Sequence, residues 1–307
     1  MSYLLKTNHL SKVFHGKEII SDVNLHVKQG EIYGFIGPNG AGKTTIMKMI
    51  TNLIKPTSGE IEMFGEKLTD TSYEILKRLG TIIEYPIFYE KLTAVENLEL
   101  HCEYMGYHNK KAIVDALELV GLKNINNKPV KEFSLGMKQR LGIARAISTK
   151  PELLILDEPI NGLDPIGIKE LRDLFKMLSK EYGMTIFVSS HILGEMEQMV
   201  DTIGVINHGK LLEEISLDSI NGRHTEYIEV VVDNSNLASF ILEEKVGIKN
   251  FKVLNHGLIR IYDSNVTQKE ISKSLVLNDI SVESINKKSH SLEEYFLKLI
   301  NGGGIHA

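Results

Sequence analysis

The chain has 307 residues, about the length at which a single hydrophobic core stops growing, so we expect two domains or a large domain with a small one. Hydrophobic residues make up 42% of it and charged residues 24%, and the net charge of -5 gives no basic character that would indicate nucleic-acid binding. No apolar run approaches the roughly 20 residues that span a bilayer, and the N-terminus lacks the apolar segment of a signal peptide, so the sequence predicts a cytoplasmic protein.

The first 65 residues predict strands and one helix around a glycine-rich loop. Residues 1–30 read as strands, partly in alternating apolar and polar order, and residues 31–37 form a short apolar run that ends in glycine. Such a run suits a buried strand that leads into a phosphate-binding loop. A helix is predicted over residues 44–54, a turn over 55–59 and another strand over 59–65.

The middle of the chain continues this alternation. Residues 93–120 have a helical pattern, with Thr93 as N-cap and Glu96 three residues later as the second half of a capping box. The apolar runs at 153–157 and 184–190 have the length of strands. Strands that alternate with helices predict a mostly parallel α/β sheet, which we assign to a first domain at residues 1–220.

The pattern changes near residue 220. Residues 219–225 are polar and contain glycine, which is typical of a linker. The elements predicted beyond it are strands at 227–233, 251–255, 258–263 and 280–285, helices at 236–247, 267–279 and 291–300, and a turn at His256–Gly257. This order predicts a small ferredoxin-like α+β domain at residues 221–307.

The segment GPNGAGKTT fits the phosphate-loop pattern G-x4-G-K-[ST]. Its glycines let backbone N–H groups turn inward around phosphates, and the following helix points its positive end at them. Lys43 is expected to bridge the β and γ phosphates of ATP, and Thr44 to place its hydroxyl on Mg²⁺. The residues expected to hold the nucleotide are Gly37, Pro38, Asn39, Gly40, Ala41, Gly42, Lys43, Thr44 and Thr45.

The segment LLILDEP places two acidic residues at the end of a predicted central strand. Asp157 is expected to hold Mg²⁺, directly or through water. Glu158 is the candidate general base that polarises an attacking water. Alone, such a pair would indicate a helix cap or a solvated turn, but the phosphate loop upstream favours the catalytic interpretation.

Between these two motifs lies FSLGMKQR, Phe133–Arg140, and in this order the motifs resemble those of the ATPase subunit of ABC transporters, from about Leu10 to Leu211. In that family a serine and a glycine at this point, here Ser134 and Gly136, cap the γ-phosphate held by the opposite subunit. The resemblance therefore implies an ABC-type P-loop NTPase fold with a helical subdomain near residues 90–145. It also implies a homodimer, or a pair with another ATPase subunit, around two ATP molecules.

The resemblance assigns three further residues. Phe14 matches an aromatic residue that stacks on adenine, although a strand core residue is the alternative. Asp164, in the segment NGLD, matches the acidic residue of a loop that crosses the dimer interface. His191 follows an apolar strand and matches the histidine that contacts the γ-phosphate during hydrolysis.

The chain departs from the commonest form of the family at three positions. Leu135 stands where a glycine is usual and Met137 where a glutamine is usual. Glu84 stands where a glutamine normally senses Mg²⁺ and the attacking water, so we count it as a candidate catalytic and metal-binding residue; alternatively, a neighbour takes this role and Glu84 faces solvent. The glutamate resembles that of transporters for self-protection against lantibiotics and bacitracin-like peptides.

The resemblance implies an ATP-hydrolysing subunit that powers efflux of, or immunity to, a peptide antibiotic through a separate permease, peripherally at the inner face of the cell membrane. Another exporter (multidrug, polysaccharide or sodium), a soluble ABC ATPase acting on ribosomes or DNA, and an inactive ATP-binding regulator are the alternatives. A single phosphate loop without sustained heptads argues against the soluble ATPase, and the complete set of catalytic residues argues against the regulator. The loop from Glu84 to about Leu92, with Tyr85, Phe88 and Tyr89, is the predicted docking surface for the permease; packing between subdomains is the alternative for these aromatic residues.

Overall fold

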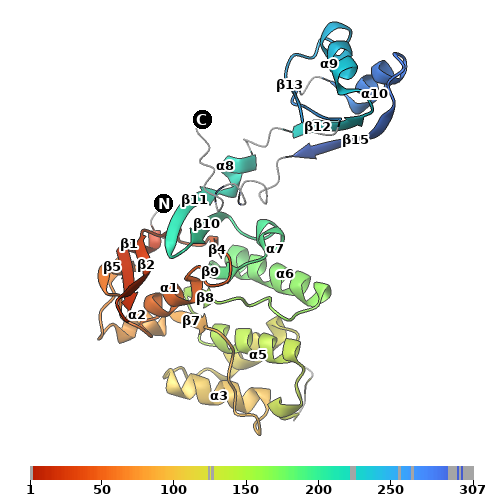
Figure 1. Cartoon of the computed structure of the whole chain (residues 1–307). Coiled ribbons are helices and arrows are strands. Elements are labelled where there is room, and N and C mark those ends of the chain that lie inside the picture. Colours follow the sequence, from red (N-terminus) through yellow and green to blue (C-terminus); the bar gives the residue numbers. More distant parts are fainter. Residues whose placement is uncertain are drawn as a thin grey trace. The chain divides into compact units, whose positions relative to one another are not determined.

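The computed structural model describes residues 3–123, 125, 128–221, 226–254, 257–263, 266–289, 296 and 299. The chain divides into two compact units, Met1–Asp218 and Ser219–Ala307 (Figure 1). Part of the predicted linker is helical, because residues 219–221 belong to α8 (Leu217–Asn221), and residues 222–225 lie outside the described residues. Each unit is considered by itself below.

A parallel sheet forms the centre of the first unit. Its strands, in spatial order, are β11 (Lys210–Ser216), β10 (Thr202–Asn207), β4 (Ile32–Ile36), β9 (Thr185–Ser190), β8 (Leu153–Leu156) and β7 (Leu79–Ile82). All neighbours are parallel except β10 and β11. Every residue of β4, β8, β9 and β10 is buried, which explains their continuous apolar sequence. The predicted α/β sheet is confirmed.

A second, antiparallel sheet is formed mainly by the N-terminal residues. It contains β1 (Tyr3–Phe14), β2 (Lys17–Val23), β3 (His26–Lys28), β5 (Ser58–Met63) and β6 (Glu66–Lys67). One cluster of buried apolar side chains joins this sheet, helix α1 (Lys43–Ile50) and the parallel sheet, and includes Leu5, Phe35, Met47 and Phe187. Helix α1 is thereby fixed directly after the central strand β4.

Three helices occupy the stretch for which the sequence predicts a helical subdomain: α3 (Ala94–Tyr104), α4 (Lys110–Leu119) and α5 (Leu135–Ile147). The capping box of Thr93 and Glu96 is present at the start of α3. The helical pattern predicted over residues 93–120 is present as two helices, because the chain breaks after Tyr104. Gly106 has a φ of 66° there, and Asn109 caps a new helix.

The remaining elements of the first unit are short, apart from α6 (Pro165–Tyr182). They are α2 (Tyr73–Lys77), the 3₁₀ turn at Val130–Glu132 and α7 (Leu193–Glu197). Helix α6 packs against β4 and β9. No helix among the described residues is both long and apolar enough to cross a membrane.

Between residues 226 and 289, the described part of the second unit is an antiparallel sheet with two helices. The strands lie in the order β13 (Phe251–Val253), β14 (Leu258–Ile261), β12 (Glu226–Val232) and β15 (Val282–Ser289), and α9 (Ser235–Glu244) and α10 (Gln268–Val276) complete a core of its own. The chain order β-α-β-β-α-β with this strand arrangement matches the prediction for a ferredoxin-like domain. His256 of the predicted turn and the predicted helix 291–300, apart from positions 296 and 299, lie outside the described residues.

Candidate active site

The predicted phosphate loop joins β4 to α1 and is packed too closely for side chains at two glycines. A Cβ atom on Gly37 would lie 2.3 Å from the carbonyl oxygen of Ile206. Gly42 has a φ of 109°, and a Cβ atom there would lie 2.4 Å from the Ile20 side chain. The loop backbone is thus held against β10 and β2, which leaves the inner side of the loop lined by peptide groups at a helix N-terminus, an arrangement that favours anions.

The ammonium group of Lys43 lies inside this loop. The residue is 6% exposed, and its Nζ atom donates a hydrogen bond of 2.7 Å to the carbonyl oxygen of Gly37. The same Nζ atom lies 3.2 Å from the Oε1 atom of Glu158. A buried ammonium requires such partners, and these partners place its charge between the loop and the acidic pair.

Thr44 and Asp157 meet on the other side of the loop. The Thr44 hydroxyl donates to Oδ2 of Asp157 over 2.7 Å, and the Ser189 hydroxyl donates to Oδ1 over 2.6 Å. Asp157 is 3% exposed and follows the last residue of β8. A hydroxyl and a carboxylate are ligands that Mg²⁺ prefers, so this pair fits the predicted metal position.

Glu158 is held in an unusual backbone conformation. Its φ is 48°, in the left-handed region that non-glycine residues rarely adopt, and its N–H group donates to the hydroxyl of Ser189 over 2.9 Å. Oε2 lies 2.9 Å from Nδ1 of His191, at the end of β9. Oε1 is buried and faces the Lys43 ammonium at 3.2 Å, and among the residues that the structure describes it makes no well-directed hydrogen bond. The site thus contains a buried carboxylate whose inner oxygen is held mainly by an ion pair and retains acceptor capacity.

Glu84 lies beside the same helix α1, but its contact differs from the predicted one. Its Oε1 atom lies 2.5 Å from Nζ of Lys48, one helical turn beyond Thr44. Its φ is 64°, and its side chain is 56% exposed. In the described part of the chain no hydrogen bond joins Glu84 to Thr44 or Asp157, so its metal contact stays a prediction.

Phe14 ends strand β1 and is 40% exposed, so the alternative that it packs in the strand core is wrong. The ammonium of Lys12 lies 4.9 Å from the centre of its ring. A half-exposed ring beside a cation can accept a flat aromatic group, and adenine stacking stays a prediction.

The two motifs expected to face a second subunit lie together. Ser134 caps α5 by accepting a hydrogen bond of 3.3 Å from the N–H of Met137, and Asp164 caps α6 by accepting one of 2.8 Å from Gly167. A Cβ atom on Gly162 would lie 2.7 Å from the Leu135 side chain, so the loop before α6 packs on the start of α5. No described hydrogen bond or ion pair joins Ser134 or Gly136 to the phosphate loop. They form a separate surface, as expected of residues that act on another chain.

Three residues that position the site are missing from the sequence-based prediction. Ser189 bridges both acidic residues, Lys48 pairs with Glu84, and the buried Gln139 donates a hydrogen bond of 2.8 Å to the carbonyl oxygen of Pro159. Only Ser189 carries a local signal, because with Ser190 it ends a fully buried strand in polar residues. The other two depend on partners 20 or more positions away in sequence, which periodicity does not reveal.

The central sheet, the helical stretch and the ordered motifs define an ATP-binding cassette. The profile of the family described as ABC transporter matches residues 20–161. A full-length relative, the ABC transporter ATP-binding protein YcbN of Bacillus subtilis (strain 168), is 64% identical over 100% of both chains. The chain therefore belongs to the family of ABC transporter ATP-binding subunits, as the sequence predicts.

Other relatives carry names that refer to antibiotics. The bacitracin transport ATP-binding protein BcrA of Bacillus licheniformis is 51% identical over 99% of this chain and 100% of its own length. The lantibiotic transport ATP-binding protein SrtF of Streptococcus pyogenes is 45% identical over 76% of this chain and 98% of its own length.

Solved structures show the same fold. The structure of an ATP-binding subunit of an ABC transporter has a TM-score of 0.65 and 32% identity, over 72% of this chain and 92% of its own. The dimeric post-hydrolysis state of the cassette MJ0796 bound to ADP and Pi has a TM-score of 0.63 and 28% identity, over 69% of this chain and 98% of its own.

Proposed function

We propose that this chain is the ATP-hydrolysing subunit of an exporter that removes a bacitracin-type peptide antibiotic through a separate membrane permease. Support for the cargo comes from the extent of the similarity. BcrA of Bacillus licheniformis matches the chain over 305 residues, which covers both units, whereas SrtF matches 234 residues, 76% of the chain. The full-length match favours bacitracin over a lantibiotic.

The proposed catalytic assembly is a dimer in which two copies close head to tail. Each ATP lies between the loop Gly37–Thr45 of one copy and Ser134–Gly136 of the other, with Phe14 against the adenine. Asp164, at the start of α6, lies at the interface. The dimeric cassette that shares this fold supports the arrangement, and so does the separation of the two surfaces within one chain.

Lys43 and the Thr44–Asp157 pair are proposed to hold the phosphates and their metal. The Lys43 ammonium exchanges the carbonyl of Gly37 for phosphate oxygens, to which it is more strongly attracted. Thr44 and Asp157 supply oxygen ligands for Mg²⁺, which when bound neutralises charge on the phosphates. Ser189 keeps the Asp157 carboxylate in place, and Glu84 is the remaining candidate near the metal.

Glu158 is proposed to act as the general base, and its buried Oε1 atom is the observation that carries this assignment. The Lys43 ammonium, 3.2 Å away, is its ion-pair partner. Once phosphates attract that ammonium, a water molecule beside this oxygen would donate to Glu158 and become a better nucleophile. The His191 ring, 2.9 Å from Oε2, orients the carboxylate from the other side, and we propose that it contacts the γ-phosphate.

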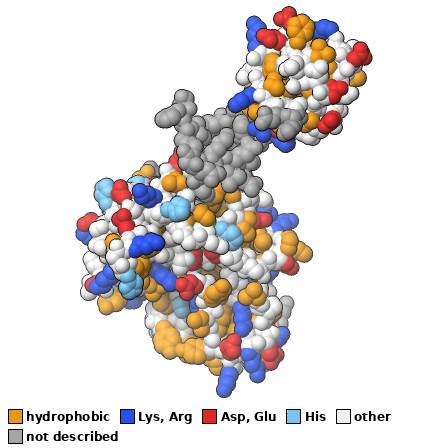
Figure 2. All heavy atoms as spheres, in the orientation of Figure 1, with side chains coloured by type: hydrophobic (Ala, Val, Ile, Leu, Met, Phe, Trp, Pro, Cys, Tyr) orange, Lys and Arg blue, Asp and Glu red, His pale blue; other side chains and the backbone are white. Residues whose placement is uncertain are grey.

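The loop from Glu84 to Leu92 is the proposed docking surface for the permease. Tyr85, Ile87 and Tyr89 are 80%, 82% and 57% exposed, an unusual concentration of large apolar side chains. Figure 2 shows hydrophobic side chains gathered over the part of the first unit that contains α3. Phe88 differs, because it is half-buried and lies 5.1 Å from the guanidinium of Arg145. Packing between elements thus accounts for Phe88, and Tyr89 keeps a contact with Tyr104 of α3 although it is exposed.

A resistance assay tests the proposed function. The chain is expressed with its permease in a bacitracin-sensitive strain, and the inhibitory concentrations of bacitracin, a lantibiotic and an unrelated cationic drug are measured. We expect the inhibitory concentration of bacitracin to rise by about tenfold or more, and this protection to vanish in Glu158→Gln. Unchanged bacitracin sensitivity alongside resistance to another compound would reject the proposed cargo and keep the exporter.

A further inference from the structure

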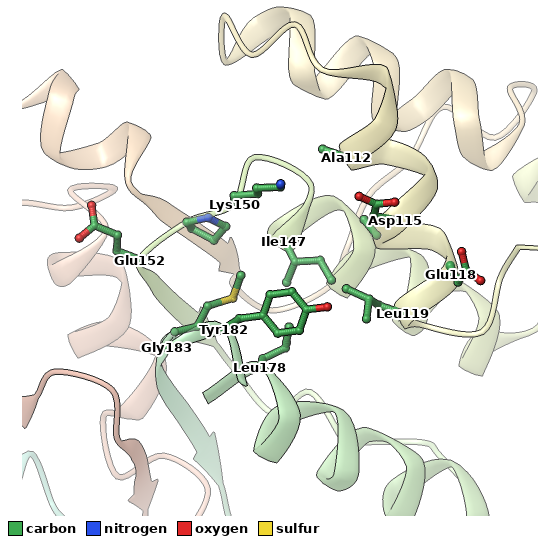
Figure 3. Close-up of a pocket in the computed structure, with 13 residues that line it drawn as sticks. Ala112, Asp115, Glu118, Leu119, Ile147, Lys150, Glu152, Leu178, Tyr182 and Gly183 are labelled. Atoms are coloured by element: carbon green, nitrogen blue, oxygen red, sulfur yellow. The ribbon is translucent and has the colours of Figure 1, made fainter. Parts of the chain in front are cut away.

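The first unit also contains a cavity that is lined by none of the candidate site residues and takes no part in the proposed function. It has a volume of about 450 Å³, within the range of roughly 300–1,000 Å³ that is usual for ligand sites. Its walls come from α4, from the turn between α5 and β8, and from the turn between α6 and β9 (Figure 3). It therefore lies where β8 and β9 begin, whereas Asp157 and His191 follow the ends of these strands.

Apolar side chains and one aromatic ring line most of this cavity. Leu119, Ile147, Leu178 and Met184 contribute aliphatic or thioether surface from four different segments. Tyr182, in the last turn of α6, projects into the space with 56% of its surface exposed (Figure 3). A ligand with apolar rings would bury this surface and stack on the tyrosine.

Carboxylates outnumber cations at the rim. Asp115 and Glu118 line the cavity from α4, and Lys150 and Glu152 line it from the turn between α5 and β8 (Figure 3). Glu118 and Glu152 each pair with a cation that does not line the cavity. In the described part of the chain Asp115 has no ion pair, so its charge is available to a ligand.

Asp115 and Lys150 are then the remaining charges of the lining and offset each other, so helix polarity decides the sign of the potential. Helices α4, α5 and α6 end at Leu119, Ile147 and Tyr182, and all three residues line the cavity. The carbonyl groups at a helix C-terminus carry a partial negative charge and favour cations. Three such ends and an unpaired carboxylate around an apolar floor select for a ligand that is both apolar and positively charged.

We propose that this cavity binds a hydrophobic cation of drug size, with an aromatic group on Tyr182 and its charge toward Asp115. Helices α5 and α6, which end at the cavity, begin at the surface expected to face the second subunit, since Ser134 caps α5 and Asp164 caps α6. A ligand between α4 and the far ends of these helices restrains their movement. We expect this restraint to slow ATP hydrolysis. Binding of the cation is independent of the proposed function, whereas its effect on hydrolysis rests on that function.

The binding test compares two ions of equal shape and opposite charge on the full-length chain. Tetraphenylphosphonium and tetraphenylborate are titrated calorimetrically at the same ionic strength. We expect the cation to bind at least about tenfold more tightly than the anion. Equal affinities, or tighter binding of the anion, would overturn the proposal.

Substitutions locate the bound cation. Leu119→Trp fills the cavity and should weaken binding of tetraphenylphosphonium by about tenfold or more, whereas Val114→Trp, half-exposed on the same helix and outside the cavity, should leave it unchanged. Asp115→Asn and Tyr182→Ala introduce no larger side chain into the cavity. Each should weaken binding of tetraphenylphosphonium by about threefold, a typical contribution of one exposed contact. Unchanged affinity in both milder variants places the ion elsewhere and overturns the site.

A final measurement separates the cavity from the proposed function. ATP hydrolysis by the wild-type chain is followed at saturating ATP while tetraphenylphosphonium is added, with Leu119→Trp as the insensitive control. We expect the rate to fall in the wild type only. Binding with no change in the rate would retain the site and reject its coupling to α5 and α6, and a chain that binds the cation but hydrolyses no ATP would reject the proposed function alone.

Discussion

At the scale of single residues, hydrogen bonds and ion pairs between residues at or just after the ends of β4, β8 and β9 hold the candidate site together. Ser189 contacts the carboxylate of Asp157 and the backbone of Glu158 at once. Because Glu158 adopts a left-handed φ, its side chain points away from the path of a regular strand and toward His191. The strain is concentrated at the residue that we propose as the base, which is where strained residues tend to occur.

Replacing Glu158 tests the proposed base. Glu158→Gln keeps the size and the contact with His191 but removes the negative oxygen that accepts a proton, so we expect ATP hydrolysis to fall by about 10²–10⁴-fold. The nucleotide should still bind, and an ATP-bound dimer should accumulate in size-exclusion chromatography. Glu197→Gln, an exposed glutamate at the end of α7, is the matched control. Normal hydrolysis by Glu158→Gln would remove the assignment.

Glu84 is linked to α1 through Lys48, and this ion pair joins the docking loop to the helix that follows the phosphate loop. The pair is half-exposed, so we expect it to contribute less than about 1 kcal/mol to stability. Glu84→Gln and Lys48→Gln should therefore change antibiotic protection more than ATP affinity. A double-mutant cycle on the inhibitory concentration of bacitracin measures the coupling; strictly additive effects would show that the ion pair has no special role.

At the scale of elements, two helices carry the residues that we assign to the second subunit. The N-terminus of α5 is capped by Ser134, and its C-terminal half is buried against the parallel sheet. The cap therefore serves both the helix and, in the proposed dimer, a phosphate of another chain. A substitution of Ser134 can be compared with the same substitution of a residue that caps another helix, which separates these two roles.

Ser134→Arg should abolish ATP hydrolysis while ATP binding by a single chain remains. The arginine obstructs the dimer surface, and loss of the cap costs ~1 kcal/mol of stability. Asn109→Arg removes a comparable cap at α4, away from that surface, and should keep its activity. Equal loss of activity in the two variants, measured with a labelled ATP analogue for binding, would indicate a stability effect only.

Helix α3 contains a histidine whose titration reports on the helical stretch. Burial, together with the nearby charge of Arg145, lowers the pKa of His101 to about 4. The unfolded chain, with an ordinary histidine pKa of about 6.5, binds the proton first, so this residue destabilises the fold progressively as the pH falls from about 6.5 toward 4. We expect a loss of about 1–2 kcal/mol over this window, reduced by partial exposure.

Urea unfolding of the wild type and of His101→Gln at pH 7 and pH 5 measures this effect. The wild type should lose more stability between the two pH values than the variant does, because only the wild type has this proton to bind. Parallel losses would show that other groups cause the pH dependence.

At the scale of the whole molecule, the features that sequence predicts well are the local ones. The phosphate loop, the burial of β4, β8 and β9 and the capping box at Thr93 each depend on a few neighbouring residues. The apolar pattern of residues 93–120 predicts helix but does not locate the break after Tyr104, which depends on the positive φ of Gly106. The Lys48–Glu84 and Gln139–Pro159 contacts join segments 36 and 20 positions apart, and only the folded chain brings them together.

The bond between Gln139 and Pro159 has a consequence for the proposed dimer as a whole. It connects α5, whose first residues meet one nucleotide, to the segment directly after Glu158, which acts on the other. Each nucleotide is then sensed at both catalytic centres, so hydrolysis should be cooperative in ATP, with a Hill coefficient above 1. In Gln139→Ala the Hill coefficient should approach 1 while ATP binding is retained. A mixed dimer with one inactive site should hydrolyse ATP at far less than half the rate of the intact dimer. The two sites would then act as one cooperative unit, in which neither nucleotide is hydrolysed independently of the other.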